Sequence, residues 1–152
     1  MRVDEIMTKD LACCTPKTTL PEAARMMAQN DCGALPVVDT PETMQIAGII
    51  TDRDIACRGM LQERNPLDLK VSDCMTPTVA TVRQDADVRD AERLMQEHQV
   101  RRIPVVDADS KCCGIVSQAD IALNAPDQET AQVLKEVSQP ARQVPAHTST
   151  VI

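Results

Sequence analysis

Hydrophobic positions follow two kinds of pattern along this chain, and the patterns come in a fixed order. Apolar residues at helical spacing occupy 20–27, and two short apolar runs rich in β-branched residues follow at 35–38 and 46–50. The helical spacing predicts an amphipathic helix with one face on a core, and the two runs predict strands. A second, short helix is expected to begin at Thr51, directly after the second run.

The second half of the chain repeats this order. Helical spacing returns at 88–95, apolar runs return at 103–106 and 112–116, and another short helix is expected from Ser117. Each half therefore predicts the same succession of elements.

Residues that favour helix ends support these assignments. Thr19 and Glu22 form a capping-box pattern with Pro21 in the first turn, and Asp87 is expected to cap the second amphipathic helix. Gly33 is expected to end the first one.

The two halves also align residue by residue, at an offset of 68 that becomes 66 after a single contraction. The matching segments are Met7-Thr8 with Met75-Thr76, 36–39 with 104–107, and 48–55 with 114–121. One repeat alone would leave a sheet face bare. We therefore expect an α+β fold of two tandem β-α-β-β-α repeats, packed through their sheets about a pseudo-twofold axis.

The alignment also sets the expected domain organisation. Repeat 1 is assigned to 1–63, a linker to 64–70 and repeat 2 to 71–124. After the repeats, 125–152 is expected to hold a short C-terminal helix and a tail rich in Pro, Gln, Ser and Thr.

Composition narrows the possible partners. The 152 residues carry a formal net charge of −7 and include no Phe, Trp or Tyr. Aromatic stacking platforms for single-stranded nucleic acid are therefore excluded, and the acidic balance disfavours nucleic acid and anionic membranes as partners. No apolar run approaches the length of a membrane span, the N-terminus has no signal-like apolar region, and we expect a cytoplasmic protein.

The repeated motifs resemble a tandem pair of CBS domains, the Bateman module, found in small bacterial proteins that contain little else. They are an M-T near the start of each unit, an [LI]-P-V-V-D strand, and G-I-[IV]-[ST]-x-x-D-I before the last helix. The resemblance covers about residues 1–124. It implies the fold above, an adenosine-containing ligand in clefts between the repeats, and a homodimer shaped as a flat four-repeat disc. It further implies a regulatory role through a partner protein that the sequence does not identify.

The last of these motifs has its own chemistry. A hydroxyl at the start of a helix, together with free backbone N–H groups, favours an anion, and an Asp one turn later can accept hydrogen bonds from a vicinal diol. The resemblance implies that Thr51 and Ser117 face phosphate, whereas Asp54 and Asp120 hold ribose. The same residues also match plain capping boxes, and the two interpretations can both hold.

The repeats differ in cationic residues. Arg101 and Arg102 precede the Ile-Pro of the second repeat, where the first has Gly33 and Ala34. The resemblance implies that a basic residue here reaches nucleotide phosphate, although a solvated basic pair at a helix end is the alternative.

We therefore hypothesise one well-formed site, built on Arg102, Ser117 and Asp120, beside a weaker or empty site. In that weaker site Arg53 or Arg58 could substitute as the cation. The expected regulatory ligand is AMP, ADP or ATP, with no obligatory cofactor. By analogy, Leu11–Cys14 and Val79–Val82 would form the walls around the adenine. These ranges complete the predicted site.

The sequence predicts no enzyme, because it shows no nucleophile–base pair, no His cluster and no P-loop, so we assign no catalytic residue. The cysteines at 13, 14, 32, 112 and 113 could gather as a thiol or zinc site. Their spacing matches no standard metal pattern, so no metal ligand is assigned. A redox- or metal-responsive module is the alternative function.

Overall fold

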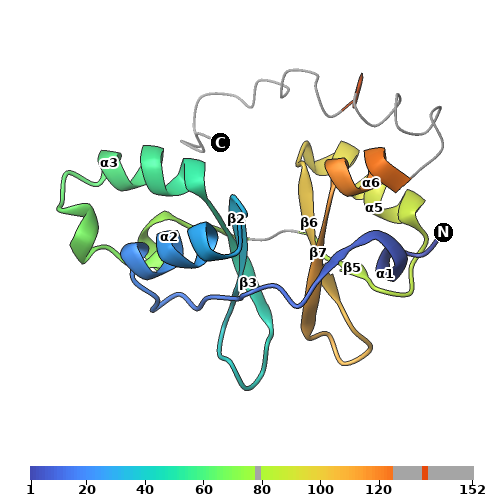
Figure 1. The fold of residues 1–152 in the computed structure, drawn as a ribbon, viewed down its shortest axis with the longest axis horizontal. Coiled ribbons are helices and arrows are strands. Elements are labelled where there is room, and N and C mark those ends of the chain that lie inside the picture. Colours follow the sequence, from blue (N-terminus) through green and yellow to red (C-terminus); the bar gives the residue numbers. More distant parts are fainter. Residues whose placement is uncertain (78–79, 125–134, 137–152) are drawn as a thin grey trace.

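The structure, a computed structural model, describes residues 1–77, 80–124 and 135–136. The ribbon forms two lobes, each with strands on the side that faces the other lobe and helices on the outside (Figure 1). The C-terminal helix and tail expected over 125–152 lie outside the described residues, apart from 135–136.

Two sheets form the centre of the molecule, with strand orders β2-β3-β4 and β1-β7-β6-β5. The strands are β1 Thr8–Lys9, β2 Ala34–Val38, β3 Ile46–Thr51, β4 Thr76–Pro77, β5 Val82–Arg83, β6 Arg102–Val106 and β7 Cys112–Ser117. β2 pairs antiparallel with β3, and β6 pairs antiparallel with β7. The four predicted apolar runs thus form the two central hairpins.

Helices cover the outer side of each hairpin (Figure 1). They are α1 Val3–Ile6, α2 Leu20–Gln29, the π-helix η1 Asp54–Arg58, α3 Gly59–Leu61, the 3-10 helix η2 Pro66–Asp68, α4 Val71–Cys74, α5 Val88–His98 and α6 Gln118–Asn124. The two longest, α2 and α5, are the amphipathic helices that the sequence predicts.

The predicted helix starts are confirmed. The Thr19 hydroxyl accepts from the Glu22 N–H at 3.3 Å, and the Glu22 carboxylate accepts from the Thr19 N–H at 3.1 Å. The Asp87 carboxylate accepts from the Arg89 N–H at 3.0 Å at the start of α5. Local side-chain chemistry therefore fixes where both helices begin.

The prediction that Gly33 ends the first helix is wrong. α2 ends at Gln29, and Asp31 takes the left-handed conformation with φ of 48°. The N–H of Cys32 then donates to the Met27 carbonyl at 3.0 Å, which completes a Schellman-type ending. An Asp can adopt this conformation, so no glycine is needed there.

The N-terminal strand of each repeat joins the sheet of the other repeat. β1 pairs with β7, and β4 pairs with β3. The crossing strands approach the backbone so closely that a Cβ at Gly114 would lie 2.6 Å from the Thr8 carbonyl oxygen, and one at Gly48 would collide with the carbonyl of Thr76. The motif glycines therefore make room for this exchange.

Each of the two hydrophobic cores also includes residues from the segment that crosses over with the exchanged strand. One core draws on residues from Cys14 to Cys74, including Leu69 and Val71. The other combines Val3, Ile6 and Met7 with residues from 82 to 121. The boundaries assigned from the sequence repeat stay a prediction, whereas the cores themselves cross those boundaries.

The two sheets also meet at the hairpin ends. Gln45 and Lys111 form an antiparallel bridge, and the N–H of Cys112 donates to the Met44 carbonyl at 2.8 Å. With this contact, the predicted fold class of two β-α-β-β-α repeats packed through their sheets is confirmed.

The expected linker at 64–70 is partly built into the first core. Leu69 is fully buried, and its carbonyl accepts from the Leu20 N–H at 3.0 Å. Among the described residues, none of the helices is both long and apolar enough to cross a bilayer.

Candidate functional site

The second repeat holds its motif residues at the junction of β7 and α6. The Asp120 carboxylate oxygen Oδ2 accepts from the Ser117 N–H and from the Ser117 hydroxyl, both at 2.7 Å. The Asp120 N–H donates to the same hydroxyl at 3.2 Å. Both residues are half-buried, and no residue in the described part of the chain donates to the other carboxylate oxygen, Oδ1. Asp120 therefore keeps one acceptor open beside a fixed hydroxyl.

The first repeat has the same helix cap, formed by Thr51 and Asp54, but the second carboxylate oxygen of its Asp lies beside a cation. The Thr51 N–H donates to Asp54 Oδ2 at 3.0 Å, and the Asp54 N–H donates to the Thr51 hydroxyl at 3.1 Å. The Nε of Arg58 lies 3.7 Å from Asp54 Oδ1, and the Nη1 of Arg58 donates to the Met75 carbonyl at 3.2 Å. Arg58 therefore forms an ion pair with Asp54 Oδ1, at a separation longer than a hydrogen bond, whereas no ion pair in the described part of the chain involves Asp120.

The difference between the repeats has a clear origin in the sequence. Asn124 stands where the first repeat has Arg58, and its amide donates to the Asp120 backbone carbonyl at 2.8 Å instead of to the carboxylate. The spacing of Asp54 and Arg58, four residues apart at a helix start, is the signal that could have revealed the ion pair. From the sequence, Arg58 is expected only as a substitute cation for phosphate.

Both predicted arginines lie at the same strand end as Ser117. Arg102 pairs directly with Ser117 between β6 and β7, and the Arg101 carbonyl accepts from the Gln118 N–H at 2.9 Å. Both side chains are exposed, and neither forms an ion pair with a residue that the structure describes. The structure thus gathers Arg102, Ser117 and Asp120 at one edge, while their binding role stays a prediction.

The predicted adenine walls are only partly described. Leu11–Cys14 is half-buried except for Cys14, which is buried and lies beside Val37 in a parallel bridge. In the second repeat Val82 is buried and pairs with Val105, but Val79 lies outside the described residues.

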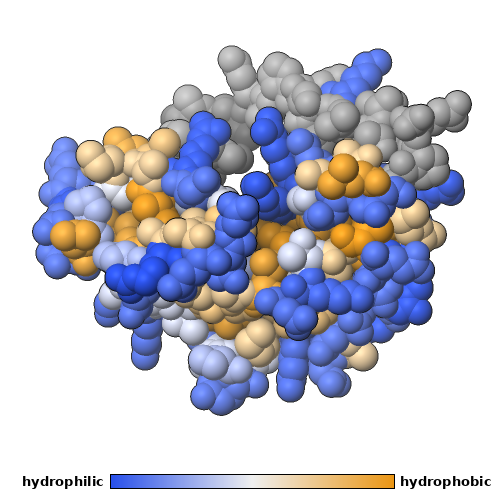
Figure 2. All heavy atoms as spheres, viewed as in Figure 1, coloured by the Kyte–Doolittle hydropathy of each residue, from blue (hydrophilic) through white to orange (hydrophobic). Residues whose placement is uncertain are grey.

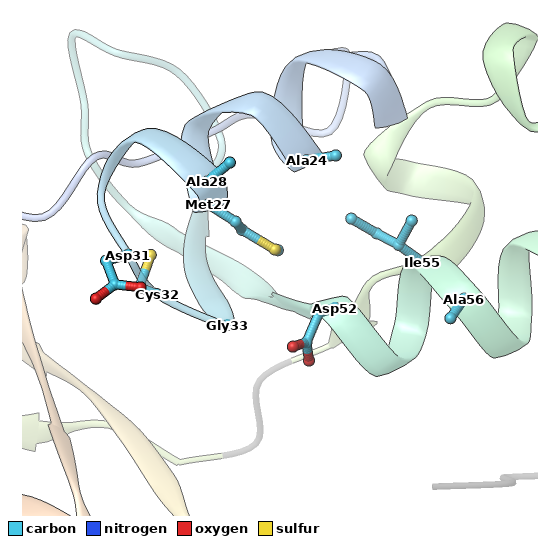
Figure 3. Close-up of a pocket in the computed structure, with 9 residues that line it drawn as sticks. All are labelled: Ala24, Met27, Ala28, Asp31, Cys32, Gly33, Asp52, Ile55 and Ala56. Carbon is cyan, nitrogen blue, oxygen red and sulfur yellow. The ribbon is translucent and has the colours of Figure 1, made fainter.

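A hollow of about 520 Å³ lies between α2 and η1 in the first repeat (Figure 3). Met27 and Ile55 point toward one another across it, and Asp31 and Asp52 lie at its rim. None of the predicted site residues lines it. Its two carboxylates disfavour an anion, so this hollow does not suit a phosphate.

The cysteines do not gather as one cluster. Within the described residues, no group of three or more His, Cys, Asp and Glu side chains could hold a metal ion. The Cys13 thiol donates to the Leu11 carbonyl at 3.6 Å, and the Cys112 thiol donates to the Gly114 carbonyl at 3.8 Å. The interaction between these two thiols lowers the pKa of Cys13 and raises the pKa of Cys112. Sequence spacing gave no reason to pair these two among the five considered.

Comparison with known proteins points to one family. The family model described as the CBS domain matches twice, at residues 3–58 and 71–126. Hypoxic response protein 1 of Mycobacterium tuberculosis is 32% identical over 136 residues, which are 90% of this chain and 93% of that protein. A crystal structure of Hypoxic Response Protein I with two coordinated zinc ions has a TM-score of 0.73 and covers 83% of this chain and all of that chain.

Two further solved structures contain adenosine compounds. CBSX2 from Arabidopsis thaliana, in complex with AMP, is 29% identical with a TM-score of 0.65, over 82% of this chain and 95% of that chain. The CBS domain pair of protein MJ0100, in complex with 5′-methylthioadenosine and S-adenosyl-L-methionine, is 28% identical with a TM-score of 0.70, over 81% of this chain and 98% of that chain.

Proposed function

The chain belongs to the CBS-domain family, and from this we propose that it is a non-catalytic regulatory module that binds an adenosine-containing nucleotide between its two repeats. Support comes from the AMP complex of CBSX2 and from the two adenosyl compounds bound to the MJ0100 domain pair. These three ligands share an adenine and a ribose with a free 2′,3′-diol, and the diol is the part that an Asp carboxylate would recognise. Cytoplasmic location and the identity of a regulated partner stay predictions.

The observation that carries the proposal is the open Oδ1 of Asp120. A carboxylate oxygen of this kind accepts hydrogen bonds from a ribose diol, and Ser117 fixes its orientation through Oδ2. Arg102, paired across the strands from Ser117, supplies positive charge for the phosphate at the same edge. In the first repeat Arg58 forms an ion pair with the corresponding oxygen of Asp54, and its charge lies beside that oxygen at 3.7 Å. We therefore assign nucleotide binding to one strong site, in the second repeat.

Calorimetric titration of the full chain with AMP, with ADP, ATP and S-adenosylmethionine in parallel, tests this proposal. We expect one strong site of micromolar affinity. Asp120→Asn keeps the capping acceptor but loses the charge, and should weaken binding by about 10–100-fold, as should Arg102→Ala. Asp54→Asn is the matched control from the other repeat and should change the affinity by less than about 2-fold. Two equal sites, or binding unaffected by Arg102→Ala, would contradict the proposal.

We also propose that the hollow beside α2 packs against a second copy of the chain. Ala24, Ala28 and Ala56 are exposed small residues around it, whereas Glu92 and Gln96 hold the positions of Ala24 and Ala28 in the other repeat. Apolar surface also shows over α3 and α6 (Figure 2), where Leu61 of α3 is 72% exposed and Leu123 of α6 is 84% exposed. An exposed apolar face of this kind favours association.

Light scattering during size exclusion should give the mass of a dimer for the wild type. Ala28→Arg should give a monomer, because it places a charge in the apolar face. Gln29→Arg, on the neighbouring polar side of α2, is the matched control and should stay dimeric. A monomeric wild type would refute the dimer.

A metal-responsive function is the second candidate, favoured by the two zinc ions of the Hypoxic Response Protein I structure. Metal analysis of protein purified without chelators tests it, with stoichiometric zinc as the supporting result. Loss of that zinc in Cys13→Ser would place the ion at the contact between the repeats.

A further inference from the structure

The hollow beside α2 has an acidic rim. Asp31 and Asp52 are both exposed there, and they are the charged residues among those that line the hollow (Figure 3). The Asp52 N–H donates to the Gly33 carbonyl at 3.0 Å, and a Cβ at Gly33 would lie 3.0 Å from the Asp52 carboxylate. The position of Gly33 therefore faces this rim.

The equivalent face of the second repeat carries an arginine instead. Arg101 is the counterpart of Gly33 in the aligned repeats. Its carbonyl accepts from the Gln118 N–H at 2.9 Å, the same bond that Asp52 makes in the first repeat. Gln99 and Gln118, both neutral, hold the positions of the two rim carboxylates. The second face thus has a cation where the first has two anions.

The alternation of side chains along β6 shows which way this arginine points. Ile103 and Val105 lie in the second core, together with residues of α5 and α6. Because side chains alternate between the two faces of a strand, Arg101 shares the helix side of the sheet and Arg102 takes the opposite side. Arg101 is exposed, and no carboxylate in the described part of the chain forms an ion pair with it. It therefore places a positive charge on the α5–α6 face.

We propose that the hollow of one copy receives the α5–α6 face of a second copy, so that each first repeat packs on the second repeat of its partner. This inference rests on the dimer proposed above and adds the orientation of its two copies. In the opposite orientation, hollow against hollow, the two rims of Asp31 and Asp52 would face each other, and like charges destabilise an interface. In the proposed orientation Arg101 faces the rim carboxylates.

The shapes of the two faces favour the same pairing. Ala24 and Ala28 are exposed beside the hollow. On α5 the longer side chains of Glu92 and Gln96 hold these positions, buried and half-buried respectively. Two alanine-lined hollows would leave a void between them, whereas the fuller α5 face fills one. The exposed Leu123 of α6 also supplies an apolar side chain for the hollow.

The dimer dissociation constant, measured by sedimentation equilibrium at low ionic strength, tests the orientation. The protein is kept free of nucleotide, because Arg101 is also a predicted phosphate ligand. Asp52→Arg and Arg101→Glu should each weaken the dimer by about 10-fold or more, because each places like charges across the interface. The double variant exchanges the two charges and should return to within about 3-fold of the wild type.

Asp109→Arg is the matched control, because it makes the same change of charge in the exposed turn between β6 and β7. It should change the dissociation constant by less than about 2-fold. Circular dichroism of each variant checks its fold. A dimer that Asp52→Arg tightens and that Arg101→Glu does not weaken would overturn the orientation while leaving the proposed dimer standing. A monomeric wild type would refute both.

Discussion

Gly114 and Gly48 show how much a single residue position can decide in this protein. Each leaves space for the carbonyl of a strand that arrives from the other repeat, at Thr8 or Thr76. A side chain at either position forces the arriving strand away, whereas a Cβ at Gly33 meets only the flexible Asp52 carboxylate, at 3.0 Å.

We therefore expect Gly114→Ala to lower the free energy of unfolding by about 1–3 kcal/mol, because the added methyl overpacks the β1–β7 contact. Gly33→Ala should change it by less than about 1 kcal/mol, since its φ is not positive and the neighbouring side chain can move. Urea unfolding of both variants measures this. Equal losses would show that the close approach of β1 is unimportant.

Asp87 gives a residue-scale prediction about pH. The hydrogen bond from the Arg89 N–H, helped by the nearby N-terminal ammonium, lowers the pKa of Asp87 in the folded state. Its contribution to stability is therefore present above the unfolded pKa and is lost as the pH falls through the folded pKa.

Asp87→Asn should accordingly flatten the fall in melting temperature between about pH 5 and pH 2, while stability at neutral pH changes little because Asn also caps helices. Melting curves across this range provide the measurement. An identical pH profile in the variant would contradict the assignment.

At the site, the sequence predicted the motif residues better than their neighbours. Ser117 and Asp120 could be located because the cap and the binding motif need the same spacing. The ion pair of Arg58 with Asp54 was not predicted although their four-residue spacing indicates it, because an arginine beside this motif also suits a phosphate.

At the scale of elements, two short helices each stabilise the other repeat. α1 packs into the second repeat, which follows it in the chain, and α4 packs into the first repeat, which precedes it. Val3 of α1 is fully buried in the second core, and the equivalent Val71 of α4 is fully buried in the first core. The matched substitutions Val3→Ala and Val71→Ala therefore test the two cores one at a time.

Each of these substitutions should cost about 1–3 kcal/mol, because a buried side chain loses two methyl groups. Amide hydrogen exchange through local opening, below the free energy of global unfolding, should rise mainly in β6 and β7 for Val3→Ala, and mainly in β2 and β3 for Val71→Ala. Exchange that rises in the substituted residue's own sequence repeat would contradict the crossed packing.

The elements themselves were largely predictable, and their partners were not. Hairpins and amphipathic helices follow from local periodicity and from caps such as Thr19 and Asp87. The helix end at Asp31 was missed because the left-handed residue is not a glycine. The crossing of β1 and β4 was missed because two identical motifs do not reveal which sheet each one joins.

At the scale of the whole molecule, the crossed segments couple the two lobes. Neither core is complete without a segment assigned to the other sequence repeat, and the sheets also meet at Gln45 and Lys111. Such coupling predicts cooperative unfolding of both lobes together.

Differential scanning calorimetry should therefore show one transition, with a calorimetric enthalpy close to the van't Hoff enthalpy. Deleting residues 1–9 should split or broaden that transition. The deletion removes Val3, Ile6 and Met7 from the second core and leaves the first core intact. Two separate transitions in the intact chain would argue against the coupling.

The crossing also sets an order of events at the ribosome. The first core is contiguous, from Cys14 to Cys74, so it can close while the rest of the chain is still being made. Residues 3–7 leave the exit tunnel before the rest of the two repeats, yet their binding surface is completed only after Ile121 has been added. This segment is thus made before both cores but is among the last to dock, and the nascent chain carries Val3, Ile6 and Met7 unprotected while the two repeats are synthesised.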